Sequence, residues 1–344
     1  MKDIRIFLRQ LGRQARSRDY AGLVLLTFCL MAFTACKKSG SPVYQKTDTS
    51  SNNPPPVIQF IKPSYNPSGL DTTKLFNPVP AVNKLQRQDL LELSGIAASR
   101  LNPGALYVHN DSGNLNQVYL TNAAGDNIGT ITLTNQSNRD WEDIAVGPGP
   151  IKGVNYVYVG DIGDNKSIFP SVYVYRFPEP DLTGASLPVN ISISQVDVIE
   201  LKYPDGPCNA ETLMVDPATN DIYIASKQSN VSKIYAARYP QSISSATTMS
   251  PVVQIYFDHA TGGDISSDGR EILMRSNQLI WYWQLPAGTT ISQGLITAPE
   301  VAPYANNEPK GEGICFAADD SGYYTDTEIK DYPGRVSAIS FYKK

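Results

Sequence analysis

Acidic residues gather in two neighbouring segments near the middle of the chain. Residues 140–143 (DWED) begin one apolar run, and residues 160–165 (GDIGDN), which include Asp161 and Asp164, end the next. A buried strand gains nothing from carboxylates unless they are hydrogen-bonded, paired with cations or bound to a metal. Carboxylate oxygens suit Ca²⁺, which takes about six to eight oxygen ligands. The two segments are therefore the first candidates for a binding or catalytic site.

The pattern around Glu142 recurs along the chain. Each copy has a polar, acidic or small residue at its first two positions and an aliphatic residue at the third. The copies begin at Ser94, Glu142, Glu211, Gly263 and Glu312, at intervals of 48, 69, 52 and 49 residues. A period of about 50 residues is typical of β-propeller blades with four antiparallel strands. Five repeats predict five blades. The alternative is six blades, with the extra blade in the long interval, which we otherwise assign to a loop inserted around residues 178–188.

Strands must position these residues. From residue 81 onward, short β-branched and aromatic runs such as 156–159 (YVYV) alternate with Asn, Asp, Gly and Pro turn signals. No stretch shows a helical period. We therefore predict an all-β fold, a single β-propeller over residues 81–344. The last repeat has room for three strands only, so a strand from about residues 82–93 is expected to complete the fifth blade and close the ring.

Propeller geometry predicts which polar side chains meet. The innermost strand of a blade begins near one mouth of the central channel, and the second strand ends near the same mouth. The innermost strands therefore bring Glu142, Glu211 and Glu312 together there, with Asp143 beside them. The second strands are expected to add His109, Asn110, Asp111, Asp161, Asp164, Asn165, Lys227, Arg275, Asn277, Asp326 and Glu328.

Three interpretations of this rim remain open. The carboxylates could be satisfied by backbone amides and basic neighbours inside the channel. They could instead hold Ca²⁺, with Lys227 and Arg275 binding an anionic substrate that the metal polarises. The third interpretation is a ligand-binding surface without chemistry. His109, close to Asp111, is either a general base or a hydrogen-bonded turn histidine.

Charge and cysteine content limit the classes of function. Without residues 1–35 the chain carries 23 basic and 31 acidic residues, a net charge of −8, which argues against nucleic-acid binding. The sequence contains no phosphate-binding glycine loop, His-Glu-x-x-His or nucleophile elbow. Beyond the N-terminal region only Cys208 and Cys315 remain. They form either one disulfide or two buried thiols, and no Cys-x-x-Cys pair suggests a metal site.

The N-terminal residues resemble a bacterial lipoprotein signal. A basic segment precedes the apolar run 21–35, which is shorter than a membrane span, and residues 33–36 (FTAC) resemble a lipobox. The resemblance implies cleavage before Cys36, acylation of Cys36, and a lipid anchor in the envelope of a Gram-negative-type bacterium, most simply in the outer membrane. Residues 36–56 predict a disordered tether, and residues 57–80 an extended, proline-rich lead-in.

Six motifs resemble those of a largely uncharacterised family of secreted bacterial β-propeller proteins. They are SGIAAS at Ser94, VHNDSG at Val108, DWEDIAVGPGP at Asp140, YVGDIGDN at Tyr158, AETLMVDP at Ala210 and GEGICF at Gly311. The more distant resemblance is to phytase-like and gluconolactonase-like propellers, some of which hold calcium at a channel carboxylate. Ser94 and Gly263 replace that carboxylate in two repeats here, so the acidic ring is incomplete.

These observations predict an envelope-anchored lipoprotein whose propeller is a binding or scaffold module with an acidic site at one channel mouth. Its ligand would be a small molecule, a glycan or a protein, and we expect a monomer. The alternative is a calcium-assisted hydrolase of a phosphoester or lactone, as the distant resemblance implies.

Overall fold

The computed structural model describes residues 58–304 and 308–344, which belong to one compact unit, Pro55–Lys344. The predicted signal peptide, the Cys36 lipidation site and the tether lie outside the described residues. Within the described ranges, no helix has the length and apolar character needed to cross a membrane.

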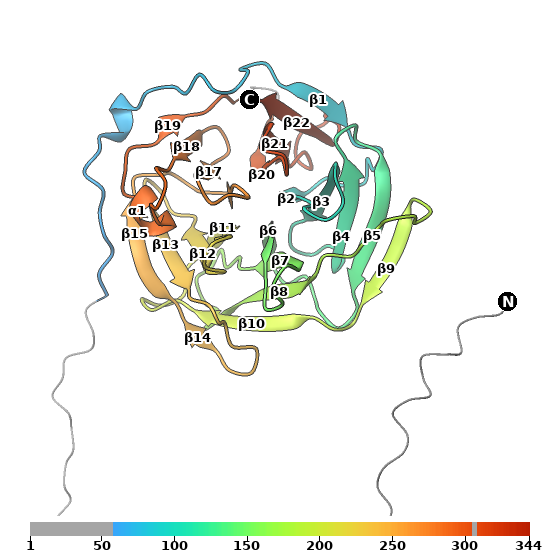
Figure 1. Cartoon of the computed structure of the whole chain (residues 1–344), viewed down its shortest axis with the longest axis horizontal. Coiled ribbons are helices and arrows are strands. Elements are labelled where there is room, and N and C mark those ends of the chain that lie inside the picture. Colours follow the sequence, from blue (N-terminus) through green and yellow to red (C-terminus); the bar gives the residue numbers. More distant parts are fainter. Residues whose placement is uncertain (1–57, 305–307) are drawn as a thin grey trace, which may run out of the picture. The chain divides into compact units, whose positions relative to one another are not determined.

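The described chain forms five β-sheets arranged around a central channel, so the predicted five-bladed propeller is confirmed (Figure 1). The innermost strand of each blade lines the channel. These strands are β2 (Leu93–Ala98), β6 (Trp141–Pro148), β11 (Ala210–Val215), β16 (Gly262–Ile265) and β20 (Gly311–Phe316). Each pairs antiparallel with a second strand that follows it in sequence. The second strands are β3 (Ala105–Asn110), β7 (Asn155–Asp161), β12 (Ile222–Ser226), β17 (Glu271–Arg275) and β21 (Gly322–Thr327).

Two further layers of strands complete the blades. The third strands are β4 (Gln117–Asn122), β8 (Val172–Pro178), β13 (Ser232–Ala237), β18 (Ile280–Gln284) and β22 (Ala338–Lys343). The fourth strands are β5 (Asn127–Leu133), β10 (Asp197–Lys202), β15 (Ser250–Ile255), β19 (Glu300–Val301) and β1 (Ala81–Lys84). The described helices are short: the 3-10 turn η1 (Pro67–Gly69) and α1 (Ile291–Gly294).

The apolar core is divided among the five contacts between neighbouring blades. Trp141 and Tyr107 pack between blades one and two, for example, and Trp281 and Tyr223 between blades three and four. Because each sheet is covered on both faces, an inner strand such as β11 (AETLMV) is buried at every position instead of alternating. This explains why the sequence shows continuous apolar runs.

The ring closes as the repeat count predicts. Strand β1 pairs antiparallel with β22, from Ala81 opposite Phe341 to Lys84 opposite Ala338. The closing strand is shorter than the expected span of residues 82–93, and it joins the N-terminal part of the fold to the last blade (Figure 1). A sheet edge on blade five is thereby covered.

Residues 58–80 run along the outer strands of blades three to five, shown in blue in Figure 1. Ile61 forms a bridge with Val253 of β15, and Thr72 forms one with Val301 of β19. Phe76 is buried, and its ring contacts those of Tyr282 and Tyr323 edge-on.

The long interval between the second and third repeats holds more than a loop. After β8 the chain crosses to blade one, where β9 (Val189–Ile193) pairs parallel with β5, and then returns to blade two as β10. Two blades therefore have five strands, since β14 (Thr247–Thr248) also adds to β10. The prediction of four strands in every blade missed these additions, because β9 and β14 pair with strands distant in sequence.

Glu179 ties this crossover to blade one. Its buried carboxylate accepts hydrogen bonds from the Ser99 hydroxyl at 2.5 Å, from the backbone N–H groups of Arg100 and Leu101 at 3.1 and 3.0 Å, and from the Tyr107 hydroxyl at 3.1 Å. Four donors on one carboxylate, all from the hairpin between β2 and β3, fix the start of the crossover.

The cysteines Cys208 and Cys315 are free thiols. Cys208 is buried between blades two and three, and Cys315 between blades five and one. Of the two alternatives, one disulfide or two buried thiols, the structure therefore shows two separate buried thiols.

Glu179→Ala should lower the free energy of unfolding by about 3 kcal/mol, because it leaves several buried donors without an acceptor. Denaturant unfolding of the variant measures this loss. The control is Asp181→Ala, an exposed carboxylate two residues further on that bonds only within its own turn. Equal stabilities of the two variants would contradict the role assigned to Glu179.

Candidate functional site

A β-bulge lies at the start of four of the five innermost strands. The register shifts between Leu93 and Gly95, Trp141 and Asp143, Ala210 and Thr212, and Gly311 and Ile314. The residues displaced from the ladder are Ser94, Glu142, Glu211 and the pair Glu312 and Gly313. A bulge re-aims the displaced side chain. The pairing of β16 with β17 in blade four has no such shift, and Gly263 occupies that repeat position.

The three glutamates meet at one mouth of the channel, as the sequence predicts. Each is nearly buried, with 3 to 4% of its surface exposed. Burial raises the pKa of Glu142, and repulsion from Glu211, Asp111, Asp140 and Glu312 raises it further. Burial, with repulsion from Glu211, raises the pKa of Glu312 to about 8. We call Asp111, Asp140, Glu142, Glu211 and Glu312 the acidic mouth.

Two lysines lie among these carboxylates. Lys227 forms an ion pair with Glu211, and Lys310 pairs with Glu328 and lies 3.2 Å from Glu312 Oε1. Burial works to lower the pKa of Lys227, but the carboxylates around it, Glu211 and Glu312 foremost, raise it overall. Lys310 is not among the residues predicted from the sequence. Its position two residues before a repeat glutamate was the available signal.

Asp111, Asp140 and Glu142 form the part of the mouth in which no ion pair is found among the described residues. One carboxylate oxygen from each lies within 4.8 Å of the other two. Burial raises the pKa of Asp140 to about 6, helped by repulsion from Asp111. Among residues 58–304 and 308–344, no side chain forms a hydrogen bond or ion pair with the carboxylate of Glu142. This trio is the group of acidic side chains in the described structure that is arranged to hold a metal ion.

Gly163, the second glycine of the GDIGDN motif, lies directly against this trio. A Cβ built on Gly163 would clash with Glu142 Oε1 and would lie 2.5 Å from Asp140 Cγ. The backbone N–H of Gly163 also donates to the Asp140 carbonyl at 3.1 Å. A side chain at this position would push the two carboxylates aside, so the glycine lets them keep their places.

Asp143 is held by backbone groups from three blades. Its carboxylate accepts hydrogen bonds from the N–H groups of Ile144 and Leu213, both at 2.8 Å, and of Gly263 at 3.4 Å. It is fully buried, and burial raises its pKa. Asp264 repeats the arrangement between blades four and five, accepting from Ile265 at 2.8 Å and Phe316 at 2.9 Å.

The two aspartates of the GDIGDN motif also bond to the protein. Asp161 accepts from the Tyr175 hydroxyl and the Asp140 N–H, both at 2.9 Å, and lies 3.4 Å from Arg139. Asp164 accepts from the Phe169 N–H at 2.7 Å. These contacts position the β7–β8 loop beside the acidic mouth.

His109 is fully buried and packs edge-on against Trp141, with 5.9 Å between ring centroids. Burial lowers its pKa, which favours the neutral ring. Its Nδ1 lies 3.1 Å from the carbonyl oxygen of Asn110, and this places the ring proton on Nδ1. The neighbouring Asn110 donates to Asn114 Oδ1 at 3.3 Å. The described contacts thus place both residues where blades one and two meet.

Arg275, a candidate anion ligand, is occupied by protein acceptors. It is fully buried, and its guanidinium donates to Glu308 Oε2 at 2.9 Å and to the carbonyls of Gly313 and Asp326 at 3.1 Å. A Cβ on Gly311 would overlap this guanidinium. The first glycine of the GEGICF motif therefore makes room for the arginine.

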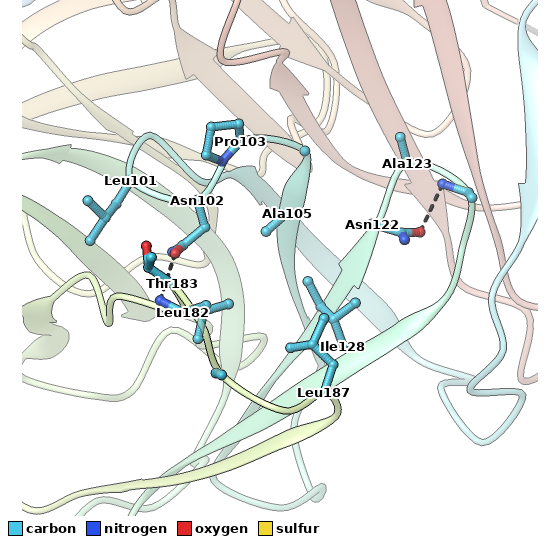
Figure 2. Close-up of a pocket in the computed structure, with 13 residues that line it drawn as sticks. Leu101, Asn102, Pro103, Ala105, Asn122, Ala123, Ile128, Leu182, Thr183 and Leu187 are labelled. Atoms are coloured by element: carbon cyan, nitrogen blue, oxygen red, sulfur yellow. Dashed lines mark hydrogen bonds between the residues drawn. The ribbon is translucent and has the colours of Figure 1, made fainter.

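A second concave surface lies at the far end of blade one from the acidic mouth. It is a groove of about 590 Å³ between the β2–β3 turn, the β4–β5 turn and the crossover (Figure 2). Leu101, Ile128, Leu182 and Leu187 give it apolar walls. Of its polar side chains, Asn102 accepts from the Leu182 N–H at 2.9 Å, as Figure 2 shows. The acidic mouth is therefore the better candidate for a site with chemistry.

No family model matches the chain, and no curated protein does. Among solved structures, the chain is similar to one in the "Crystal structure of Nidogen/Laminin Complex", with 11% sequence identity and a TM-score of 0.40. The similarity covers 68% of this chain and 72% of that one. The fold assignment rests on the strand topology described above.

The acidic mouth predicts a pH-dependent stability. The raised pKa of Glu312, about 8 against an ordinary 4.5, means that the folded state binds more protons than the unfolded chain between these values. The free energy of unfolding must then fall as the pH rises. The lowered pKa of His109 acts in the opposite direction, but only near and below its ordinary value of 6.5.

We therefore expect the Tm of the protein in chelator to fall as the pH rises from about 7 to about 8.5. Differential scanning calorimetry measures the slope. Glu312→Gln should flatten it, because the amide does not titrate. A Tm that rises across this range, or an unchanged slope in the variant, would show that Glu312 does not titrate as described.

Proposed function

We propose that this protein is an envelope-anchored lipoprotein whose propeller is a binding module, and that Asp111, Asp140 and Glu142 bind a divalent cation, Ca²⁺ in particular. The observation that carries the proposal is the carboxylate of Glu142, which is almost buried beside two further carboxylates and has no partner among the described residues. A buried carboxylate is stable only when its charge is removed or balanced.

The chemistry of the trio favours a hard cation. All three proposed ligands are carboxylates, and the group contains no histidine or cysteine. Carboxylate oxygens are the ligands that hard cations such as Ca²⁺ prefer. Three carboxylates supply only part of the about six to eight oxygens that Ca²⁺ takes. The remaining positions would be left for water or for oxygens of a ligand that approaches the mouth.

The charges around the trio favour a neutral or cationic ligand over an anionic one. Lys227 and Lys310 are both paired with carboxylates, and Arg275 is buried against Glu308. A phosphoester or carboxylate would find no unpaired cationic side chain among these three residues, so only the bound cation would balance its charge. This supports binding of a neutral hydroxylated compound or a glycan, or of a protein surface, in place of phosphoester hydrolysis.

One observation keeps a calcium-assisted hydrolase of a neutral lactone as the second candidate. The pKa of Asp140, raised to about 6 mainly by burial, is closer to neutrality than that of an ordinary aspartate. A carboxylate with such a pKa is a more effective general base near neutral pH. In this alternative Asp140 would act as that base in place of binding the cation, and Asp111 and Glu142 would hold the cation beside the substrate carbonyl.

Cation binding can be measured by titration calorimetry on the mature chain carrying Cys36→Ser. Glu142→Gln and Asp140→Asn should each weaken Ca²⁺ binding at least about ten-fold, or about 1.4 kcal/mol, because a charged oxygen ligand is lost. Asp126→Asn, in the exposed β4–β5 turn, is the control and should bind as the parent protein does. The proposal would be overturned if elemental analysis of the purified protein detected no metal and Ca²⁺ did not raise the Tm.

Gly163→Ala tests the geometry without removing a carboxylate. The new methyl group should displace Glu142 and Asp140 and weaken Ca²⁺ binding to a similar extent. Gly69→Ala is the matched control, since a Cβ there comes no closer than 3.7 Å to another atom. Equal affinities in the two variants would place the cation elsewhere.

The anchor is tested by fractionation of cells that produce the full chain. The wild-type protein should sediment with membranes and incorporate a clickable palmitate analogue, whereas Cys36→Ser should lose the label and become soluble. Cys29→Ser changes the other cysteine of the N-terminal region and should remain membrane-bound. A labelled Cys36→Ser protein, or an unlabelled wild type, would contradict lipidation at Cys36.

A further inference from the structure

Three side chains at the edge of the channel-mouth face form a hydrogen-bonded chain of a serine, a histidine and an aspartate. The ring nitrogen His259 Nδ1 lies 2.9 Å from Asp258 Oδ1, and His259 Nε2 lies 3.2 Å from the hydroxyl oxygen of Ser229. Ser229 lies in the β12–β13 loop, and the other two residues lie between β15 and β16. None of the three belongs to the acidic mouth.

In the neutral form of His259, these two contacts define the position of the ring proton. A carboxylate only accepts, so Nδ1 carries the ring proton and donates it to Asp258. Nε2 is then the lone-pair nitrogen, and the Ser229 hydroxyl donates to it. This is the tautomer that a histidine needs to act as general base toward a serine, with the aspartate orienting the ring.

The backbone holds the two loops in register. The N–H of Asn230 donates to Asp258 Oδ1 at 2.6 Å, and the N–H of His259 donates to the Gln228 carbonyl at 3.0 Å. Asn230 and His259 have positive φ angles of 65° and 47°. A positive φ is uncommon outside glycine, although asparagine and histidine adopt it more often than most residues, and the two hydrogen bonds keep both residues in this conformation. The loops are thus locked in the arrangement that brings His259 to Ser229.

We propose that Ser229 is the nucleophile of a second, metal-independent site that hydrolyses neutral carboxylic esters, with His259 as its general base and Asp258 as the positioning residue. Ser229 Oγ bonds to the carbonyl carbon while its proton passes to His259 Nε2. The bond to the alkoxy oxygen breaks, and the leaving alcohol takes that proton. Water then cleaves the acyl-serine by the same proton path, releasing the carboxylic acid and restoring Ser229.

The surroundings define the substrate class. The side chains of His259 and Asp258 are 45% and 58% exposed, so a substrate reaches the serine directly from solvent. The developing oxyanion is also open to water, which limits the site to esters with good leaving groups. The nearby acidic mouth disfavours anionic esters.

The test is labelling of the full chain with a biotinylated fluorophosphonate, followed by mass spectrometry of the labelled peptides. The reaction joins Oγ to phosphorus and expels fluoride. Ser245 serves as an internal control, because it is exposed and its hydroxyl contacts Ser242 instead of a histidine. We expect labelling of Ser229 to exceed that of Ser245 at least about ten-fold, and His259→Ala to abolish the difference.

Asp258→Asn should reduce labelling of Ser229 while His259 remains present, because an asparagine can stabilise the wrong ring tautomer. Circular dichroism and the Tm verify that the variants are folded. Asp126→Asn should leave labelling unchanged, and labelling in chelator should equal labelling in Ca²⁺, so failure of the cation site and failure of this site are distinguishable. Equal labelling of Ser229 and Ser245, or undiminished labelling in His259→Ala, would overturn the proposal.

Discussion

The inner edges of the blades impose the constraint on which the centre of this molecule depends. The innermost strand of every blade is a sheet edge, and its N–H groups point into a channel where no further strand can pair with them. Asp143 accepts from Leu213 and Gly263 of the next two blades, and Asp264 accepts from Phe316 of blade five. Buried carboxylates therefore accept the hydrogen bonds that a further strand would otherwise accept. In doing so they link neighbouring blades at the centre of the ring.

That solution brings many carboxylates into a small volume. Those that accept several backbone hydrogen bonds, such as Asp143, find their hydrogen-bond partners within the protein, and burial raises the pKa of Asp143 as well. Those re-aimed by bulges, such as Glu142 and Glu312, have raised pKa values because burial and mutual repulsion both oppose their charge. Lys227 and Lys310 balance the negative charges of Glu211 and Glu312, on the side of the mouth formed by blades three and five. The side formed by blades one and two lacks such a partner, so protons or an added cation must complete it.

The sequence predicts the five-bladed ring, but it does not predict the added strands or the separate environments of neighbouring carboxylates. The repeat interval predicted five blades, the closing strand and the meeting of Glu142, Glu211 and Glu312, because strand period and blade length are local properties. It did not predict β9, whose partner β5 lies more than fifty residues away in the chain. It also could not separate Asp143 from Glu142, because one bulge sends adjacent carboxylates to different environments. Ser229 and His259 carry no local motif, since they meet only through two loops.

The lead-in along blades three to five has a mechanical consequence. A pull on the chain ahead of residue 58 acts first on the contacts of Ile61 with β15, then on those of Thr72 with β19, and then on the bond from the Asn77 N–H to the Lys343 carbonyl. Only after these have opened in turn does the load reach β1. Strand β1 holds the ring closed by pairing with β22. The contacts of residues 58–80 would therefore break one after another before a pulling force reached the β1–β22 pairing.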